Sequence, residues 1–135
     1  TAKEAIRIIA QAVSIPVCLH VCGTIASIID ELLAMPVQIL DFEGSVNEEN
    51  LASFSKTDLK DRYIGYGIVD SSSPTLETVE VVKQRLLKGI DLLGPERILA
   101  DPDCGLRMHT PERAFEKLSL LTMAVDEVRQ NLCSS

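Results

Sequence analysis

The chain alternates short apolar runs with longer segments whose apolar residues recur at helical spacing, and this alternation constrains its fold more than any other feature. Four runs, at residues 15–19, 37–42, 62–69 and 98–100, are rich in β-branched or aromatic residues, as buried strands are. One helical pattern precedes the first run, and another follows each of the four. Strands joined through helices pair in parallel with right-handed crossovers, so the sequence predicts an α/β fold built from (β/α) units.

The expected helices can be bounded by their capping residues. Thr24, Ser73 and Thr110 are candidate N-caps, because a hydroxyl can accept the free N–H groups of a first helical turn. Gly94 followed by Pro95 ends the long apolar pattern that follows Ser73. We therefore expect helices at about residues 5–12, 24–33, 48–54, 74–93 and 111–132.

Composition and charge limit the kinds of protein this chain can be. Its 135 residues, 46% of them hydrophobic and 24% charged, suit one globular domain spanning residues 1–135. The net charge of −7, without a cluster of Lys and Arg, excludes a nucleic-acid surface. No apolar run reaches the roughly 20 residues of a membrane span, and the features of a signal peptide are missing. We expect a cytoplasmic protein with reduced thiols that binds neither nucleic acid nor membrane.

Four residues with metal-binding side chains follow the ends of predicted strands: His20, Cys22, Glu43 and Cys104. His20 and Cys22 are two residues apart in an extended segment, so their side chains point to the same side. The carboxyl ends of parallel strands meet at one rim, where ligands distant in sequence can converge. Zinc takes four tetrahedral ligands of these types, and the sequence therefore predicts a Zn²⁺ site.

Two acidic residues are candidates for a catalytic role near this site. Asp70 and Asp103 each stand at a strand end, where a carboxylate can orient a ligand's second nitrogen or bind a substrate ammonium. The alternative for both is formation of a turn or a helix cap. Cys18, within the first strand, is expected in the core instead.

Several segments together resemble the C-terminal catalytic barrel of the cobalamin-independent methionine synthase family: the His20-Val21-Cys22 triplet, residues 39–43, residues 67–74 and, above all, residues 95–106 with their DPDCGL sequence. The resemblance runs over nearly the whole chain. It implies that the chain corresponds to about the second half of a TIM (β/α)8 barrel. It also implies that His20, Cys22, Glu43 and Cys104 are zinc ligands. The implied activity is methyl transfer to a zinc-bound thiol, converting homocysteine to methionine.

The chain departs from the family pattern in three places, which affect the choice of methyl donor and the completeness of the barrel. Ser72 stands where the family commonly has a histidine proposed to protonate a folate leaving group, and a serine hydroxyl is not acidic enough for that task. We therefore rank a methyl-corrinoid donor ahead of methyltetrahydrofolate. Arg107 replaces the family's lysine, which keeps the charge and changes its geometry. The upstream strands of the family barrel have no counterpart in this chain.

That last departure predicts either a fragment of a longer polypeptide or a chain that associates with a partner or with itself. A half-barrel exposes two strand edges and an apolar inner face, both of which favour pairing. Two alternatives to the methionine synthase interpretation stay open. One is a corrinoid:thiol methyltransferase resembling uroporphyrinogen decarboxylase, and the other is a non-catalytic zinc-binding fragment.

Overall fold

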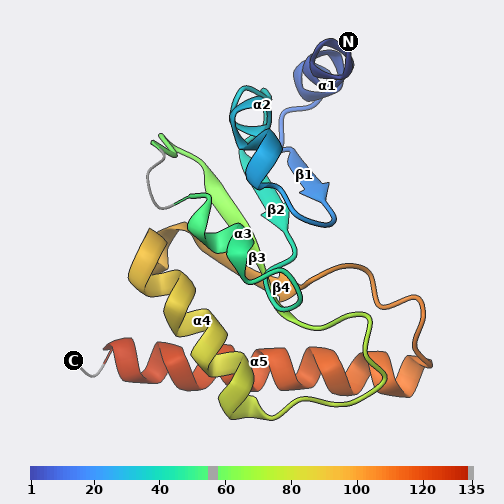
Figure 1. Ribbon diagram of the computed structural model, residues 1–135, viewed down its shortest axis with the longest axis vertical. Coiled ribbons are helices and arrows are strands. Elements are labelled where there is room, and N and C mark those ends of the chain that lie inside the picture. The colour runs from blue at the N-terminus through green and yellow to red at the C-terminus, as the bar shows by residue number, and fades with distance from the viewer. Residues whose placement is uncertain (55–57, 134–135) are drawn as a thin grey trace.

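The computed structural model describes residues 1–54 and 58–133, and within them the chain forms a parallel four-stranded sheet (Figure 1). The strands are β1 (Cys18–Val21), β2 (Ile39–Phe42), β3 (Tyr63–Val69) and β4 (Ile98–Pro102), and they lie side by side in chain order. All three pairings are parallel. The predicted α/β fold of consecutive (β/α) units is confirmed.

Two long helices cover one side of this sheet. The helix α4 (Val79–Leu93) connects β3 to β4, and α5 (Pro111–Cys133) follows β4 and packs against α4 (Figure 1). The other connections are short, and α1 precedes β1. Their bounds are α1 (Ala2–Gln11), the 3-10 turn η1 (Ala26–Ile28), α2 (Ile29–Leu33), α3 (Glu49–Ala52) and the 3-10 turn η2 (Pro95–Arg97). No helix among the described residues is long and apolar enough to cross a lipid bilayer.

The core lies between the sheet and the two long helices. Ile64, Tyr66 and Ile68 alternate along β3, so they share the face that the helices cover, and each is at most 1% exposed. The ring of Phe42 on β2 lies 5.6 Å from that of Tyr66, centroid to centroid. The glycines of β3 fall on the opposite face, where the carboxylates of neighbouring segments pack against their bare backbone.

The two edges of the sheet differ in how they are covered. Within the described chain, β1 and β4 each pair on one side only. The helix α1 lies beyond β1, at the far end from α5 (Figure 1), and none of its residues is buried. Its Ile8 and Ile9 side chains are each 59% exposed. The apolar stripe that predicted this helix is therefore real, but Ile8 and Ile9 are exposed, and of the isoleucines of α1 only Ile6 packs against the core.

The predicted start of the helix that ends before Gly94, α4, was wrong. That helix begins at Val79 with Thr78 as its N-cap, not at Ser73 and Pro74. The carboxylate of Asp70 accepts the backbone N–H groups of Ser72 and Ser73, which folds this segment into a turn. Lys117 Nζ, from α5, then donates to the carbonyls of Asp70 and Thr75 and holds the turn in place.

Other predicted boundaries also differ from the structure. The helix expected from Thr24 is η1 followed by the short α2, without a side-chain cap, because the Thr24 hydroxyl donates to Glu49 at 3.3 Å. The first strand begins at Cys18, not at Ile15, which is 70% exposed. The Thr110 cap is confirmed, since its hydroxyl accepts the Arg113 N–H at 3.3 Å.

Candidate metal centre

Three of the four predicted ligands converge where β1 and β4 end. The side chains of His20, Cys22 and Cys104 bring one donor atom each to within 4.8 Å of one another. The sulfur of Cys22 lies 3.3 Å from Nε2 of His20 and 3.8 Å from the sulfur of Cys104. Residues 82 positions apart in sequence thus share one small volume.

The ends of the strands explain this convergence. His20 lies on β1, Cys22 just follows it, and both side chains point to one side of the extended segment. Gly23 then takes a φ of 79°, a conformation that favours glycine, and turns the chain away. Cys104 lies two residues beyond the end of β4 and is only partly exposed.

The spacing of the donor atoms suits zinc. Two sulfurs bound to one zinc ion at about 2.3 Å each, at a tetrahedral angle, lie about 3.8 Å apart. The measured separation of the Cys22 and Cys104 sulfurs is 3.8 Å. Thiolates and an imidazole are also the ligand types that zinc selects. The three side chains therefore fit the metal that the sequence predicted.

Glu43, the fourth predicted ligand, lies beside the three but outside the group that they form. Its carboxylate oxygen Oε2 accepts the Gly23 N–H at 2.8 Å and Asn47 Nδ2 at 2.7 Å. Its charge is one cause of the raised pKa of the Cys22 thiol, after burial and the neighbouring Cys104. The carboxylate is thus held next to Cys22 by the two segments that follow β1 and β2.

The two thiols differ in their electrostatic surroundings. Hydrogen bonds from His20 and from the Gly105 N–H lower the pKa of the Cys104 thiol. Burial lowers the pKa of the His20 imidazole, whereas the hydrogen bonds with Asp41 and Cys104 raise it. The net result is a raised pKa. The cluster therefore favours a thiolate on Cys104, which is the metal-binding form of cysteine.

A residue that the sequence analysis missed contacts the other nitrogen of His20. Asp41 lies directly opposite His20 in the pairing of β1 with β2, and its Oδ2 forms a hydrogen bond of 2.9 Å with Nδ1 of His20. The sequence makes Asp70 and Asp103 the candidates to orient a ligand nitrogen or to bind a substrate ammonium. The strand register, which a single sequence does not display, gives this contact to Asp41.

Asp103 binds the loop after β2. Its side chain is 1% exposed, and its carboxylate accepts the backbone N–H groups of Gly44, Ser45 and Val46 at 2.8 to 3.1 Å, together with the Ser45 hydroxyl. Glu43 immediately precedes this loop. Asp103 therefore connects the segment that carries Cys104 to the segment that carries Glu43.

Asp70 shapes a turn at the end of β3. Its Oδ1 accepts the Ser72 N–H at 2.7 Å, the Ser72 hydroxyl at 2.6 Å and the Ser73 N–H at 3.1 Å. Burial raises the pKa of Asp70, whereas these hydrogen bonds lower it. The net result is a lowered pKa. Asp70 therefore forms a turn, which was the alternative to a catalytic role for this residue.

A second carboxylate lies near Asp41 on the sheet. Burial, followed by the charge of Asp41, raises the pKa of Asp101 to about 8. Within the described chain, Oδ1 of each of these two aspartates is buried without a hydrogen-bond partner. Asp101 therefore holds its proton at neutral pH.

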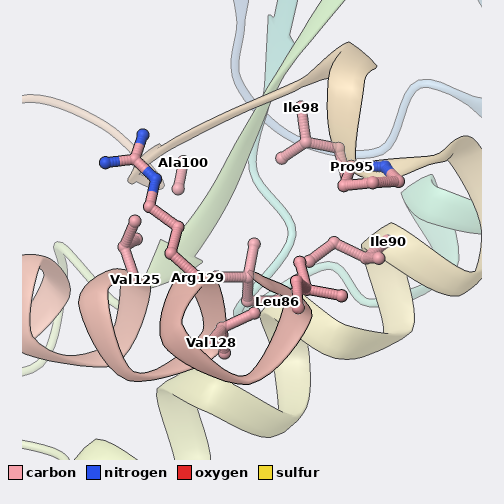
Figure 2. Close-up of a pocket in the computed structure, with 9 residues that line it drawn as sticks. Leu86, Ile90, Pro95, Ile98, Ala100, Val125, Val128 and Arg129 are labelled. Atoms are coloured by element: carbon pink, nitrogen blue, oxygen red, sulfur yellow. The ribbon is translucent and has the colours of Figure 1, made fainter. Parts of the chain in front are cut away.

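The pocket drawn in Figure 2 is separate from this centre. It is an apolar hollow between α4, α5 and the start of β4, with Leu86, Ile98 and Val128 among its walls. The guanidinium group of Arg129 lies at its margin (Figure 2). The ligand cluster lies beyond the opposite end of β4, so this pocket contains none of the candidate ligands.

The fold and the cluster together define a class of protein, a β/α protein with a group of thiols and an imidazole at the carboxyl ends of its strands that could hold a metal ion. The profile of the family described as "Cobalamin-independent synthase, Catalytic domain" matches residues 1–127. The chain belongs to this family. The sequence resemblance is thereby confirmed.

Curated relatives carry related names. The methionine synthase of Methanothermobacter marburgensis is 37% identical over 127 residues, which cover 94% of this chain and 41% of that protein. The 5-methyltetrahydropteroyltriglutamate–homocysteine methyltransferase of Thermosynechococcus vestitus is 30% identical over 118 residues, 86% of this chain and 15% of that protein. The chain thus spans less than half the length of these relatives.

A solved structure supports the fold assignment. The B12-independent methionine synthase of a Shewanella species superposes with a TM-score of 0.84 at 16% identity, over 98% of this chain and 44% of that one. The four (β/α) units therefore correspond to about half of that TIM barrel.

Proposed function

We propose that this chain is the zinc-binding part of a methyltransferase that methylates a zinc-bound thiol, with homocysteine as acceptor and methionine as product. The observation that carries the proposal is the convergence of the His20, Cys22 and Cys104 donor atoms within 4.8 Å. The family and the names of the relatives support the reaction and its acceptor. They also favour this enzyme class over one resembling uroporphyrinogen decarboxylase.

Glu43 completes the ligand set in this proposal. Its carboxylate lies beside Cys22 and is oriented by hydrogen bonds from Gly23 and Asn47. When bound, zinc lowers the pKa of a coordinated thiol, so that the substrate sulfur is present as the nucleophilic thiolate at neutral pH. Two cysteine thiolates and a glutamate outweigh the charge of the ion, which keeps that sulfur electron-rich and favours alkyl transfer over hydrolysis.

For Asp70 and Asp103 we propose positioning roles. Asp103 holds the loop that begins at Glu43, and Asp70 shapes the turn after β3. Both act through other residues at the rim of the sheet. The carboxylate of each already accepts several hydrogen bonds, which supports this assignment over direct contact with a substrate.

The residues after β3 support a choice of methyl donor. The Ser72 hydroxyl donates to Asp70 at 2.6 Å, so it is committed to the turn, and it lacks the acidity of an imidazolium. A methyl-corrinoid needs no such acid, because its leaving group is the reduced cobalt. We therefore propose a methyl-corrinoid donor ahead of methyltetrahydrofolate.

The complete reaction needs the other strands of a barrel. The chain matches about 40% of its archaeal relative, and β1 and β4 present unpaired edges within the described residues. We propose that further (β/α) units, from a longer polypeptide or a partner chain, complete the substrate site. The four free cysteines support a reducing, cytoplasmic location.

A methylation assay tests this proposal. The chain, zinc-loaded and supplied with the (β/α) units that complete the barrel, is incubated with homocysteine and either methylcobalamin or methyltetrahydrofolate, and methionine is quantified. We expect zinc-dependent methionine formation from methylcobalamin, its loss in Cys104→Ser and its retention in the control Cys133→Ser. A zinc-loaded complete barrel that forms no methionine from either donor would favour the alternative of a non-catalytic zinc-binding protein, and a robust folate-dependent rate would overturn the donor assignment.

A further inference from the structure

Asp41 has no assigned part in the proposed chemistry, yet it makes the polar contact that determines how His20 can bind a metal. Its Oδ2 lies 2.9 Å from Nδ1 of His20, within hydrogen-bonding distance. The two residues are direct partners in the register of β1 and β2, so this contact is built into the pairing of the strands. The Asp41 side chain is only 18% exposed, which limits competition from water.

The third strand is shaped to accept this carboxylate. Gly65 is the register partner of Asp41 on β3. A Cβ added at Gly65 would lie 2.7 Å from Cβ of Asp41 and 2.9 Å from its Cγ and Oδ1. These separations are shorter than real Cβ contacts allow, and a residue other than glycine would push the Asp41 side chain away from its present position.

The placement of Asp41 is costly for the fold. Its second oxygen, Oδ1, is buried without a hydrogen-bond partner in the described part of the chain. A buried carboxylate oxygen without a partner destabilises the folded state. Unfavourable arrangements of this kind concentrate at functional sites, where the group is needed for something other than stability.

We propose that Asp41, seated on the bare backbone of Gly65, is a positioning residue that keeps the hydrogen of His20 on Nδ1 and leaves Nε2 as the metal-binding atom. The geometry agrees, since Nε2 lies 3.3 Å from the sulfur of Cys22. Carboxylates that orient a metal-bound histidine in this way raise its basicity and fix its tautomer. The inference rests on the proposed function only in assuming that the cluster binds zinc.

Zinc affinity, measured by competition with a chromophoric chelator, tests the role. We expect Asp41→Ala to bind zinc about 10 to 100-fold more weakly than the wild type. Asp41→Asn, whose amide oxygen can still accept the Nδ1 hydrogen, should lose less. The matched control is Asp30→Asn, on the exposed surface of α2, which should bind as the wild type does. Wild-type affinity in Asp41→Ala would overturn the inference.

A double-mutant cycle tests whether Gly65 acts through Asp41. Gly65→Ala should weaken zinc binding by displacing the carboxylate. The double variant Gly65→Ala with Asp41→Ala should bind no more weakly than Asp41→Ala alone, because the two changes remove the same contact. Fully additive losses would overturn the part assigned to Gly65.

The tautomer of His20 can be read without a metal. The chain has two histidines, so a His109→Gln variant leaves the ¹⁵N signals of His20 to be assigned by NMR. We expect hydrogen on Nδ1 in the metal-free wild type and a shift toward Nε2 in Asp41→Ala, and an unchanged tautomer would contradict the inference. A wild-type chain that binds no zinc would refute the proposed function instead, while the tautomer result would still stand.

Discussion

Asp103 is a buried carboxylate that joins two loops of the metal centre. Three backbone N–H groups and one hydroxyl from the loop after β2 donate to it. Charged acceptors of this kind form stronger hydrogen bonds than neutral ones. Its contribution is therefore to stability and to the placement of Glu43, and both can be measured.

Replacement of Asp103 should destabilise the protein strongly. Asp103→Ala leaves the N–H groups of Gly44, Ser45 and Val46 without their acceptor, and we expect a loss of about 3 kcal/mol in the free energy of unfolding. Urea denaturation of the metal-free protein measures it. Asp126→Ala, an exposed change on α5, is the control. A loss for Asp103→Ala no larger than that of the control would show that these contacts contribute little.

Asp101 should make stability depend on pH. Its pKa is raised to about 8 in the folded protein, from an ordinary value of 3.8, first by burial and then by the charge of Asp41. Between these two pKa values the folded chain keeps a proton that the unfolded chain releases. The free energy of unfolding therefore falls as the pH rises from 3.8 to about 8. Thermal unfolding of the metal-free protein should show a melting temperature that falls from about pH 5 to about pH 8. The fall should be smaller in Asp101→Asn than in the wild type. Equal decreases in both proteins would contradict the assignment.

The strand β3 shows how a segment can serve the core on one face and the site on the other. Ile64, Tyr66 and Ile68 point toward the helices, whereas Gly65 and Gly67 leave room for the carboxylates of Asp41 and Asp103. The two glycines thus have a role in packing that their low strand propensity alone would not indicate.

Adding a methyl group at Gly67 tests this close approach. The new Cβ would lie 2.4 Å from Oδ1 and 2.7 Å from Cα of Asp103, so backbone must move. We expect Gly67→Ala to lower the free energy of unfolding by about 1 to 3 kcal/mol. Gly105→Ala, where no atom lies within 4 Å of the added Cβ, provides the comparison. Equal stability of the two variants in chemical denaturation would argue against tight packing at Gly67.

The order of the strands and the convergence of His20, Cys22 and Cys104 could be predicted, because both follow from hydrophobic pattern and from the rule that parallel strands end at one rim. The start of α4 could not, since Asp70 and Lys117 stabilise a turn through contacts that local capping signals do not encode.

Strand phase and register account for two further differences. Cys18 was expected in the core and is exposed, because it lies two residues before His20 and shares the face of that ligand. Asp41 was overlooked because its role depends on which residue of β1 it faces. A single sequence gives the periodicity of a strand but not its partner.

The molecule as a whole presents surfaces that a complete barrel would cover. The edges of β1 and β4 are unpaired within the described residues, and the apolar stripe of α1 is exposed. We expect the isolated chain to associate at micromolar concentration, as open strand edges favour. Sedimentation velocity over a dilution series measures this, with Ile8→Glu/Ile9→Glu expected to weaken association. A chain that sediments as a monomer at every concentration would contradict the expectation.

In the proposed zinc site, His20, Cys22 and Cys104 are the converging donors, with Glu43 beside them. The most direct test of this proposal is the zinc content of the purified chain by plasma mass spectrometry, compared with Cys104→Ser and with the control Cys133→Ser. We predict about one zinc per chain in the wild type and in the control, and almost none in Cys104→Ser, because the site loses one of its two cysteine thiolates. A wild-type protein without zinc, or a Cys104→Ser variant that retains it in full, would contradict the proposal.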